Sequence, residues 1–263
     1  MDLGLTGKRA LVTGSSSGIG AGIARLLTAE GCAVVVHGRD AAKARAVADS
    51  IGAAGVAIGD LSTNAGADAV AAAAGVIDIL VNNAGGAVGT SAMMWDEVDE
   101  AGWEATYQMN AIAAARMIRR LLPSMKAKGW GRIINIASAA ATQPIPYGPD
   151  YGAAKAAMLN MTVSLTKALG SCGVTANSIS PGMILTPAVE GWLAELRGTM
   201  GWGDISIEEA EARATRELTP VPVGRAGRVE EIAHVVCMIA SPASGYMTGA
   251  NIRMDGGQVQ SVN

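Results

Sequence analysis

A tyrosine and a lysine stand four positions apart in the segment Tyr151-Gly-Ala-Ala-Lys155. At that spacing on a helix, both side chains project from the same face. A cation beside a tyrosine stabilises the phenolate and lowers the phenol pKa from its ordinary value of about 10. Such a tyrosine can act as a general acid or base nearer neutral pH. The pair indicates proton-transfer chemistry, although this spacing also occurs by chance.

Two polar residues upstream are candidates for the same chemistry. Ser138 follows an apolar run and precedes Tyr151 by thirteen residues, so its hydroxyl could hydrogen-bond a substrate carbonyl oxygen. Asn110 falls within a long helical region. An amide is neutral to unfavourable inside a helix unless it has a partner or a task.

A glycine-rich segment, residues 13–20 (TGSSSGIG, here the glycine loop), follows the first apolar run and opens a helix. Glycines let a backbone approach a pyrophosphate closely, and a helix N-terminus offers unpaired N–H groups with positive dipole character. The spacing is G-x-x-x-G-x-G rather than the usual dinucleotide fingerprint G-x-G-x-x-G. Its place after the first strand favours a nucleotide site over a simple turn.

The ends of the next apolar runs carry further candidates. The second run ends at His37-Gly38-Arg39, where NAD-selective sites place a carboxylate for the ribose 2′-hydroxyl. Arg39 could instead pair with a 2′-phosphate, its alternative being a solvated surface arginine. We expect His37 to pack at the strand end. The third run ends at Asp60 and Leu61, where a side chain could contact adenine, and the fourth at Asn82-Asn83-Ala84-Gly85.

The pattern of apolar residues predicts the strands and helices that would position these candidate residues. Predicted strands cover 9–13, 33–37, 56–60, 77–81, 132–137, 174–180 and 250–254; predicted helices cover 19–30, 41–51, 65–74, 103–128, 151–170 and 229–240. The strands are continuous apolar runs, which indicates burial on both faces. Strand–helix alternation predicts an α/β fold: a Rossmann-like three-layer sandwich with a doubly wound parallel sheet of about seven strands and helices on both faces.

Nothing marks a second domain, so residues 1–263 are expected to form one. Two stretches, 85–99 and 182–227, interrupt the alternation. The second is long for a compact fold, which often marks a binding segment. We expect residues 187–222, with a helical patch at 207–217, to form a lid over the substrate, the alternative being a rigid loop.

Composition excludes several classes. The 263 residues carry a net charge of −3, so no basic surplus exists for nucleic-acid binding. The three cysteines are widely spaced and predict neither disulfides nor a metal cluster. The N-terminus does not resemble a signal peptide, and no apolar stretch is long enough for a transmembrane helix. We therefore expect a cytoplasmic protein without a metal or a membrane partner.

The motifs together resemble the short-chain dehydrogenases/reductases over residues 8–257. The signals occur in the family's order: TGSSSGIG at 13–20, DL at 60–61, NNAG at 82–85, Asn110, Ser138, YGAAK at 151–155, PG at 181–182, Thr186 and SGYMTGANIRMDGG at 244–257. Each motif is weak alone, but the ordered set is specific.

The resemblance implies a catalytic group of four residues. Tyr151 would protonate a carbonyl oxygen during reduction, or take the alcohol proton during oxidation. Lys155 would lower the Tyr151 pKa and bind the nicotinamide ribose. Ser138 would polarise the substrate oxygen, and Asn110 would support a water relaying protons towards Lys155. The cofactor-binding residues it implies are Gly14, Ser15, Ser17, Gly18, Ile19, Gly20, Arg39, Asp60, Leu61, Asn83, Ala84, Gly85, Tyr151, Lys155, Pro181, Gly182, Ile184 and Thr186.

The function expected is NADP(H)-dependent interconversion of a small-molecule carbonyl compound and its alcohol, in a homotetramer. Arg39 favours NADP(H) over NAD(H), although Ser17 stands where many NADP-using members have a basic residue. One alternative is a 3-oxoacyl-carrier-protein reductase, which would need a basic patch for its acidic carrier. The charged residues in the segment 187–217 are instead mainly acidic. Another is a non-catalytic dinucleotide sensor, which would not need all four catalytic residues.

Overall fold

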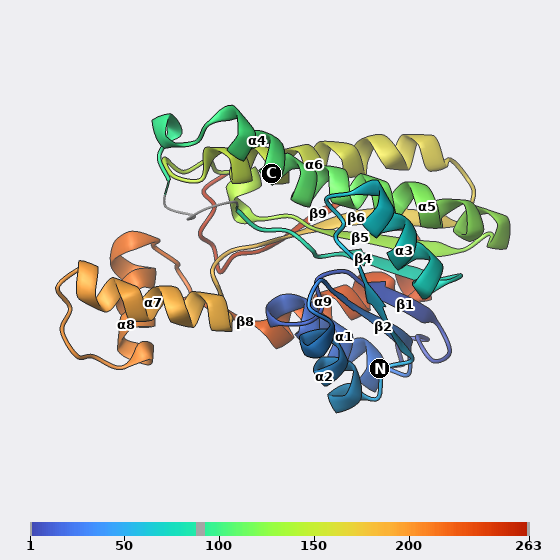
Figure 1. Ribbon diagram of the computed structural model, residues 1–263, viewed down its shortest axis with the longest axis horizontal. Helices are drawn as coiled ribbons and strands as arrows, with labels where there is room; N and C mark the ends of the chain where they lie inside the picture. The colour runs from blue at the N-terminus through green and yellow to red at the C-terminus, as the bar shows by residue number, and fades with distance from the viewer. Residues whose placement is uncertain (1, 88–92, 262–263) are drawn as a thin grey trace.

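Seven parallel strands form one sheet in the computed structural model, which describes residues 2–87 and 93–261 (Figure 1). The order across the sheet is β3-β2-β1-β4-β5-β6-β9. The strands are β1 (Arg9–Val12), β2 (Ala33–Gly38), β3 (Gly55–Ile58), β4 (Ile79–Asn82), β5 (Gly131–Ile136), β6 (Val174–Pro181) and β9 (Asn251–Met254). The predicted sheet is confirmed. Within the irregular stretch 85–99, residues 88–92 lie outside the described part.

Helices cover both faces of the sheet, as predicted. One face carries α1 (Gly18–Ala29), α2 (Ala41–Ile51) and α9 (Val229–Ala240); the other carries α3 (Asn64–Ala74), α5 (Ala113–Lys128) and α6 (Pro149–Leu169) (Figure 1). The β-branched strand residues contribute to two separate apolar cores, one on each face. A Cβ on Gly22 of α1 would lie 2.0 Å from Val229 of α9, so a glycine is required where these helices meet.

The helix predicted over 103–128 begins earlier and is interrupted. It comprises α4 (Glu100–Tyr107), a π-helical turn (Gln108–Ile112) and α5. The Asp99 side chain caps the start by accepting from Gly102 N at 2.8 Å. The π-helical turn contains Asn110, and such turns often occur at functional sites.

The segment 187–222, which the sequence predicts to be a lid, contains a small helical unit. It contains α7 (Pro187–Thr199), α8 (Ile207–Arg213) and a π-helical turn (Ala214–Leu218), and lies beyond the end of the sheet in Figure 1. Its own apolar cluster centres on Leu193, Ala210 and Ala214. The short parallel pair β7 (Ile184–Leu185) and β8 (Gly227–Arg228) joins its base to the body.

Helix α7 is absent from the sequence-based expectation. Gly191 and Gly198 lie within it, and glycine weakens a helical pattern. The structure supplies two compensations: the Thr186 hydroxyl accepts from Val189 N at the N-terminus, and Leu193 is fully buried against α8. Pro187 at the first helical position also suits the fixed φ of proline.

The order of the strands predicts a binding site at the carboxyl ends of the central strands. From β1 the chain builds outward through β2 and β3, and then returns to the other side of β1 to place β4, β5 and β6. In an open α/β sheet, ligands bind beyond the carboxyl ends of the strands at such a reversal. Among the described residues no helix is long and apolar enough to cross a membrane.

Candidate active site

A cavity of about 300 Å³ lies at the carboxyl ends of the central strands. Most of the predicted site residues line it: Gly14, Ser17, Gly18, Ile19, Gly20, Asn83, Gly85, Ser138, Tyr151, Lys155, Pro181, Gly182 and Thr186. The cavity therefore brings together the glycine loop, three of the four predicted catalytic residues and the segment after β6, whereas Asn110 lies outside its lining.

The start of helix α6 positions the tyrosine and the lysine. Gly148 adopts a left-handed conformation (φ +61°) before the helix, and Pro149 occupies its first turn. One turn separates Tyr151 from Lys155, whose ammonium lies 5.6 Å from the centre of the tyrosine ring. Lys155 Nζ donates to Ile136 O at 2.9 Å, so β5 fixes the lysine. Ser138 follows β5 and lines the same cavity.

Burial dominates the proton affinities of this pair. The pKa of Tyr151 is raised from its ordinary value by burial, which the neighbouring Ser138 hydroxyl opposes. The pKa of Lys155 falls to about 8, because burial penalises the ammonium. The sequence led us to expect that Lys155 would lower the Tyr151 pKa, but the influences on this phenol are burial, which raises the pKa, and the Ser138 hydroxyl, which lowers it.

Substituting Lys155 with methionine is expected to change how the free energy of unfolding depends on pH. The lysine pKa is 10.5 ordinarily and about 8 when folded, so between these pH values the unfolded chain binds more protons. Wild-type stability should therefore rise with pH across this window relative to the variant, by about 3 kcal/mol in total. Urea unfolding at intervals from pH 7 to 10.5 measures the difference.

The matched control is Lys167→Met, because Lys167 lies on the same helix and is exposed. The control should follow the wild-type profile throughout. Parallel profiles for wild type and Lys155→Met would mean that the folded protein accommodates the ammonium without cost.

Asn110 is buried, and its side chain bonds to three backbone groups. Its Nδ2 donates to Thr106 O at 2.8 Å and Gly86 O at 2.7 Å, and its Oδ1 accepts from Gly86 N at 3.1 Å. A Cβ on Gly85 would lie 2.3 Å from Asn110 Oδ1 and 3.2 Å from Lys155 Nζ. Asn110 thus holds the segment after β4 against Lys155. The π-helical turn that contains Asn110 places its side chain where it can bond to Gly86.

The glycine loop is pinned by the segment after β4. Asn83 Nδ2 donates to Thr13 O at 2.9 Å and Gly14 O at 3.2 Å, while the Thr13 hydroxyl accepts from the N–H groups of Asn83 and Ala84. A Cβ on Gly14 would lie 2.8 Å from Ala84 Cα, and one on Gly20 would lie 2.4 Å from Gly14 O. The loop is therefore a cradle that larger residues would fill.

Other predicted cofactor residues lie outside the cavity lining. Ser15, Leu61 and Ile184 are buried, and the Ser15 hydroxyl donates to Val12 O at 2.7 Å. Any contact of these three with a nucleotide would come from their backbone. Ala84 packs beside the glycine loop, whereas Arg39 and Asp60 are exposed. Among the described residues Arg39 has no hydrogen-bond or ion-pair partner, so its guanidinium is available.

Sequence reasoning missed several lining residues. Ile136, Ala137, Pro187 and Ala188 also border the cavity. Their only signal was adjacency to Ser138 and Thr186, because small or apolar side chains carry no chemistry of their own. Among the described residues, no cluster of three or more His, Cys, Asp or Glu side chains is arranged to hold a metal ion.

A doubly wound sheet with a glycine-loop cradle facing a tyrosine–lysine pair defines a nucleotide-dependent oxidoreductase. A family model described as short chain dehydrogenase matches residues 8–196. The chain belongs to the short-chain dehydrogenase/reductase family and is an oxidoreductase of that family.

Individual proteins are similar to this chain over nearly all of its length. The oxidoreductase YvaG of Bacillus subtilis is 38% identical and the alignment covers 100% of both chains. The 3-oxoacyl-[acyl-carrier-protein] reductase of Vibrio cholerae is 34% identical over 97% of this chain and 98% of its own. The structure of L-sorbose reductase from Gluconobacter frateurii, complexed with NADPH and L-sorbose, superposes with a TM-score of 0.91 at 33% identity over 100% of both chains.

Proposed function

We propose that the protein is an NADP(H)-dependent oxidoreductase that interconverts a small-molecule carbonyl compound and its alcohol. The observation that carries this proposal is a single cavity lined by Ser138, Tyr151, Lys155 and the glycine loop. The nicotinamide cofactor supplies the hydride chemistry. The chain has to bind it, orient the substrate and move one proton.

Each catalytic side chain has a position suited to one task. The Tyr151 phenol faces the cavity and donates its proton to the carbonyl oxygen in reduction, or accepts the hydroxyl proton in oxidation. The Ser138 hydroxyl binds the same substrate oxygen. Lys155 is held by Ile136 O and Asn110 by Gly86, so both lie at fixed positions behind the tyrosine. A proton can then be passed inward through a water beside Asn110.

NADP(H) is the cofactor we propose, with NAD(H) as the alternative. The glycine loop fits a pyrophosphate, because its cradle excludes any Cβ at Gly14 and Gly20. At the end of β2 the carboxylate of Asp40 caps helix α2 by accepting from Ala42 N and Lys43 N, whereas the exposed Arg39 has no hydrogen-bond or ion-pair partner among the described residues. The NADPH complex of L-sorbose reductase, which shares the fold closely, supports the same choice.

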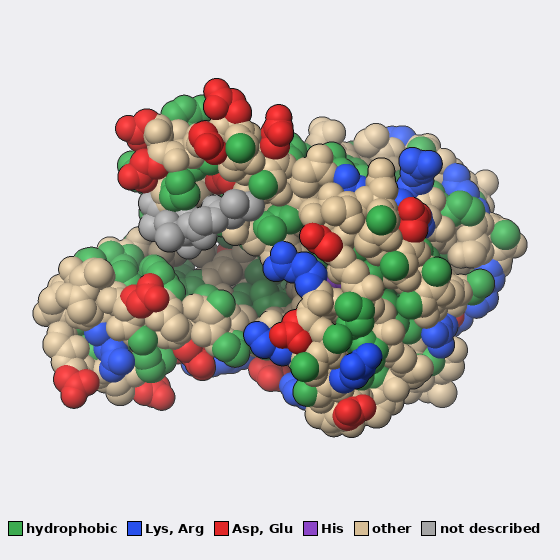
Figure 2. Space-filling model, viewed as in Figure 1, with side chains coloured by type: hydrophobic (Ala, Val, Ile, Leu, Met, Phe, Trp, Pro, Cys, Tyr) green, Lys and Arg blue, Asp and Glu red, His purple; other side chains and the backbone are tan. Residues whose placement is uncertain are grey.

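Reduction of a carrier-bound 3-oxoacyl group is the second candidate, favoured by the relative in Vibrio cholerae. The acidic groups above the site and on the lid oppose it. Figure 2 shows a hollow between the lid and the body, with acidic groups crowded above it, others on the lid, and basic groups at its edge on the body. Asp96, Glu97, Asp99 and Glu100 are all exposed before and at the start of α4. An acidic carrier would be repelled there.

A panel of ketones, aldehydes and alcohols, assayed by nicotinamide absorbance with both nucleotides, tests the function. We expect turnover of free small carbonyl compounds with NADPH, and no gain when the same 3-oxoacyl group is presented on an acyl carrier protein. A strong preference for the carrier-bound substrate would favour the second candidate. Binding of nucleotide without turnover of any substrate would leave a dinucleotide sensor.

We also propose a homotetramer. Helix α6 carries Val163 with 46% of its surface exposed, Ile112 is 38% exposed, and Tyr246 is fully exposed before β9. These are separate exposed side chains, so the proposal rests on the family resemblance, and they mark positions that a partner subunit would cover. Light scattering after size-exclusion chromatography should give four times the mass of one chain; a monomer mass would contradict the proposal.

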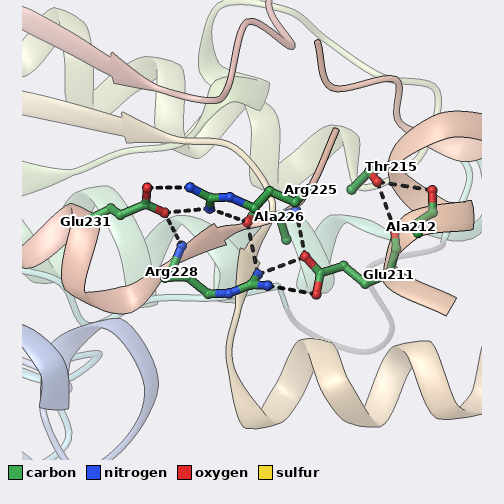
Figure 3. Close-up of polar contacts among 7 residues, drawn as sticks. All are labelled: Glu211, Ala212, Thr215, Arg225, Ala226, Arg228 and Glu231. Carbon is green, nitrogen blue, oxygen red and sulfur yellow. Dashed lines mark hydrogen bonds and ion pairs between the residues drawn. The ribbon is translucent and has the colours of Figure 1, made fainter. Parts of the chain in front are cut away.

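A polar network anchors helix α8 of the predicted lid to the start of α9 (Figure 3). The buried Glu211 carboxylate accepts from Arg228 Nη1 at 2.8 Å, from Arg228 Nη2 at 3.2 Å and from Ala226 N at 2.9 Å. Glu231 pairs in turn with Arg225 at 2.8 Å and caps α9 through Arg228 N at 2.7 Å. In contrast, the partners of Arg197 of α7 among the described residues, Ile205 O and Asp204, both lie within the lid segment.

We expect this asymmetry to govern how the lid closes. Amide hydrogen exchange in residues 187–199 should slow markedly when NADPH and a substrate analogue bind, because closure excludes water from the site. Residues 207–218 should stay protected in both states. Glu211→Ala should release them in the free protein, whereas Glu209→Ala, which removes an exposed pair with Arg213, should not. Equal, strong protection of 187–199 in both states would show a rigid loop instead.

A further inference from the structure

His37 lies at the end of β2 with 2% of its surface exposed, between the glycine loop and the turn after β3. Its Nδ1 is 2.8 Å from Gly14 N, and its Nε2 is 3.1 Å from Gly59 O. A backbone N–H can only donate and a carbonyl oxygen can only accept. Both bonds form together only in the neutral imidazole with its proton on Nε2, so the two partners fix the tautomer.

The backbone of His37 holds the next residue of the loop as well. His37 N donates to the Ser15 hydroxyl at 2.9 Å, and Ser15 N donates to His37 O at 2.8 Å. His37 contributes only its backbone to these two bonds, so they do not require the imidazole. The imidazole can therefore be altered without removing the bonds to Ser15, and it is the group that accepts the hydrogen bond from Gly14 N.

Gly14 is constrained on two sides in its present conformation. It adopts a left-handed conformation (φ +65°), and the position of its absent Cβ is 2.8 Å from Ala84 Cα. Ala84 therefore limits Gly14 on one side, while its N–H is held by His37. Without an acceptor, a poorly solvated N–H would turn the peptide to seek another partner.

We propose that His37 is a positioning residue for the nucleotide site: its neutral imidazole holds Gly14 and thereby keeps the glycine loop in the shape that receives a pyrophosphate, and protonation of the imidazole releases the loop. The proposal rests on the proposed function, because it assigns the loop to a cofactor. It adds a residue whose sequence context indicated simple packing.

Two charged groups face His37, Arg39 from the end of β2 and Asp60 from the turn after β3. Burial is the largest influence and lowers the pKa of His37, Arg39 acts in the same direction, and the Gly59 carbonyl and Asp60 oppose them. Protonation would place an N–H at Nδ1 against the N–H of Gly14, and two donors cannot bond. Cofactor affinity should therefore decrease as the pH falls below the ordinary imidazole range.

Two variants separate these effects. His37→Asn retains an acceptor for Gly14 and does not titrate, whereas His37→Phe retains the ring but has no acceptor. Calorimetric titration with NADP⁺ at pH 7.5 should give the Phe variant roughly tenfold weaker binding and the Asn variant nearly wild-type binding, with kcat at saturating cofactor preserved in both. In the nucleotide-free protein, amide exchange of residues 13–17 should be faster in the Phe variant.

The pH arm compares wild type with His37→Asn from pH 7.5 to 5.5. Taking the ratio of the two affinities at each pH cancels the effect of the titrating 2′-phosphate of the cofactor. We expect the affinity of wild type to fall more than that of His37→Asn as the pH decreases. Identical pH profiles, or wild-type affinity and exchange in a folded Phe variant, would overturn the proposal. Should the Phe variant fail to fold, as judged by circular dichroism, the comparison with Asn decides. If wild type binds neither nucleotide, the proposed function fails, while exchange still tests the loop.

Discussion

Replacing Tyr151 with phenylalanine is expected to lower kcat by at least about a hundredfold, since general acid–base catalysis contributes 10²- to 10⁴-fold. The substitution removes one hydroxyl and retains the ring. Lys155 is held independently by Ile136 O, and the glycine loop by Asn83, so the cofactor site should be unchanged. The affinity for NADP(H) should therefore stay within about twofold of wild type.

Steady-state rates with the best substrate of the panel, together with calorimetric binding of NADP⁺, measure both quantities. Tyr107→Phe is the matched control, because Tyr107 stacks on Trp103 at a centroid distance of 6.4 Å and does not line the cavity. It should keep wild-type kcat. If Tyr151→Phe retains more than about a tenth of wild-type kcat, another group supplies the proton.

Replacing Arg39 with alanine is expected to raise the KM for NADPH by at least about tenfold while changing the KM for NADH much less. A lost charge-assisted hydrogen bond is worth about 1.5–3 kcal/mol, which corresponds to roughly 10- to 150-fold. Arg39 is exposed, and its guanidinium has no partner among the residues that the structure describes. The substitution should therefore remove a phosphate contact without disturbing the fold.

Arg45→Ala provides the comparison, because Arg45 is an exposed arginine on the adjacent helix α2. It removes the same charge from the region and should affect both nucleotides slightly and equally. Wild-type enzyme that uses NADH as well as NADPH, or better, would show that Arg39 is an ordinary surface residue and that the preference for NADP(H) is wrong.

The sheet, its helical layers and the family could all be predicted from the sequence. These follow from local patterns: continuous apolar strands, helices of regular period and motifs in a fixed order. The structure also placed most of the predicted site residues around one cavity, because the strand ends that carry Gly14, Asn83, Ser138 and Pro181 are brought together by a parallel sheet.

The contacts and protonation properties of those residues, in contrast, depend on the folded chain. Helix α7 depends on the burial of Leu193 against α8, which outweighs two internal glycines. The proton affinities of Tyr151 and Lys155 depend on burial, which spacing cannot report. His37 has the sequence context of a packing residue, yet its ring bridges Gly14 and Gly59 from distant segments. Contacts between positions far apart in the chain leave no local pattern, so they appear only once the chain is folded.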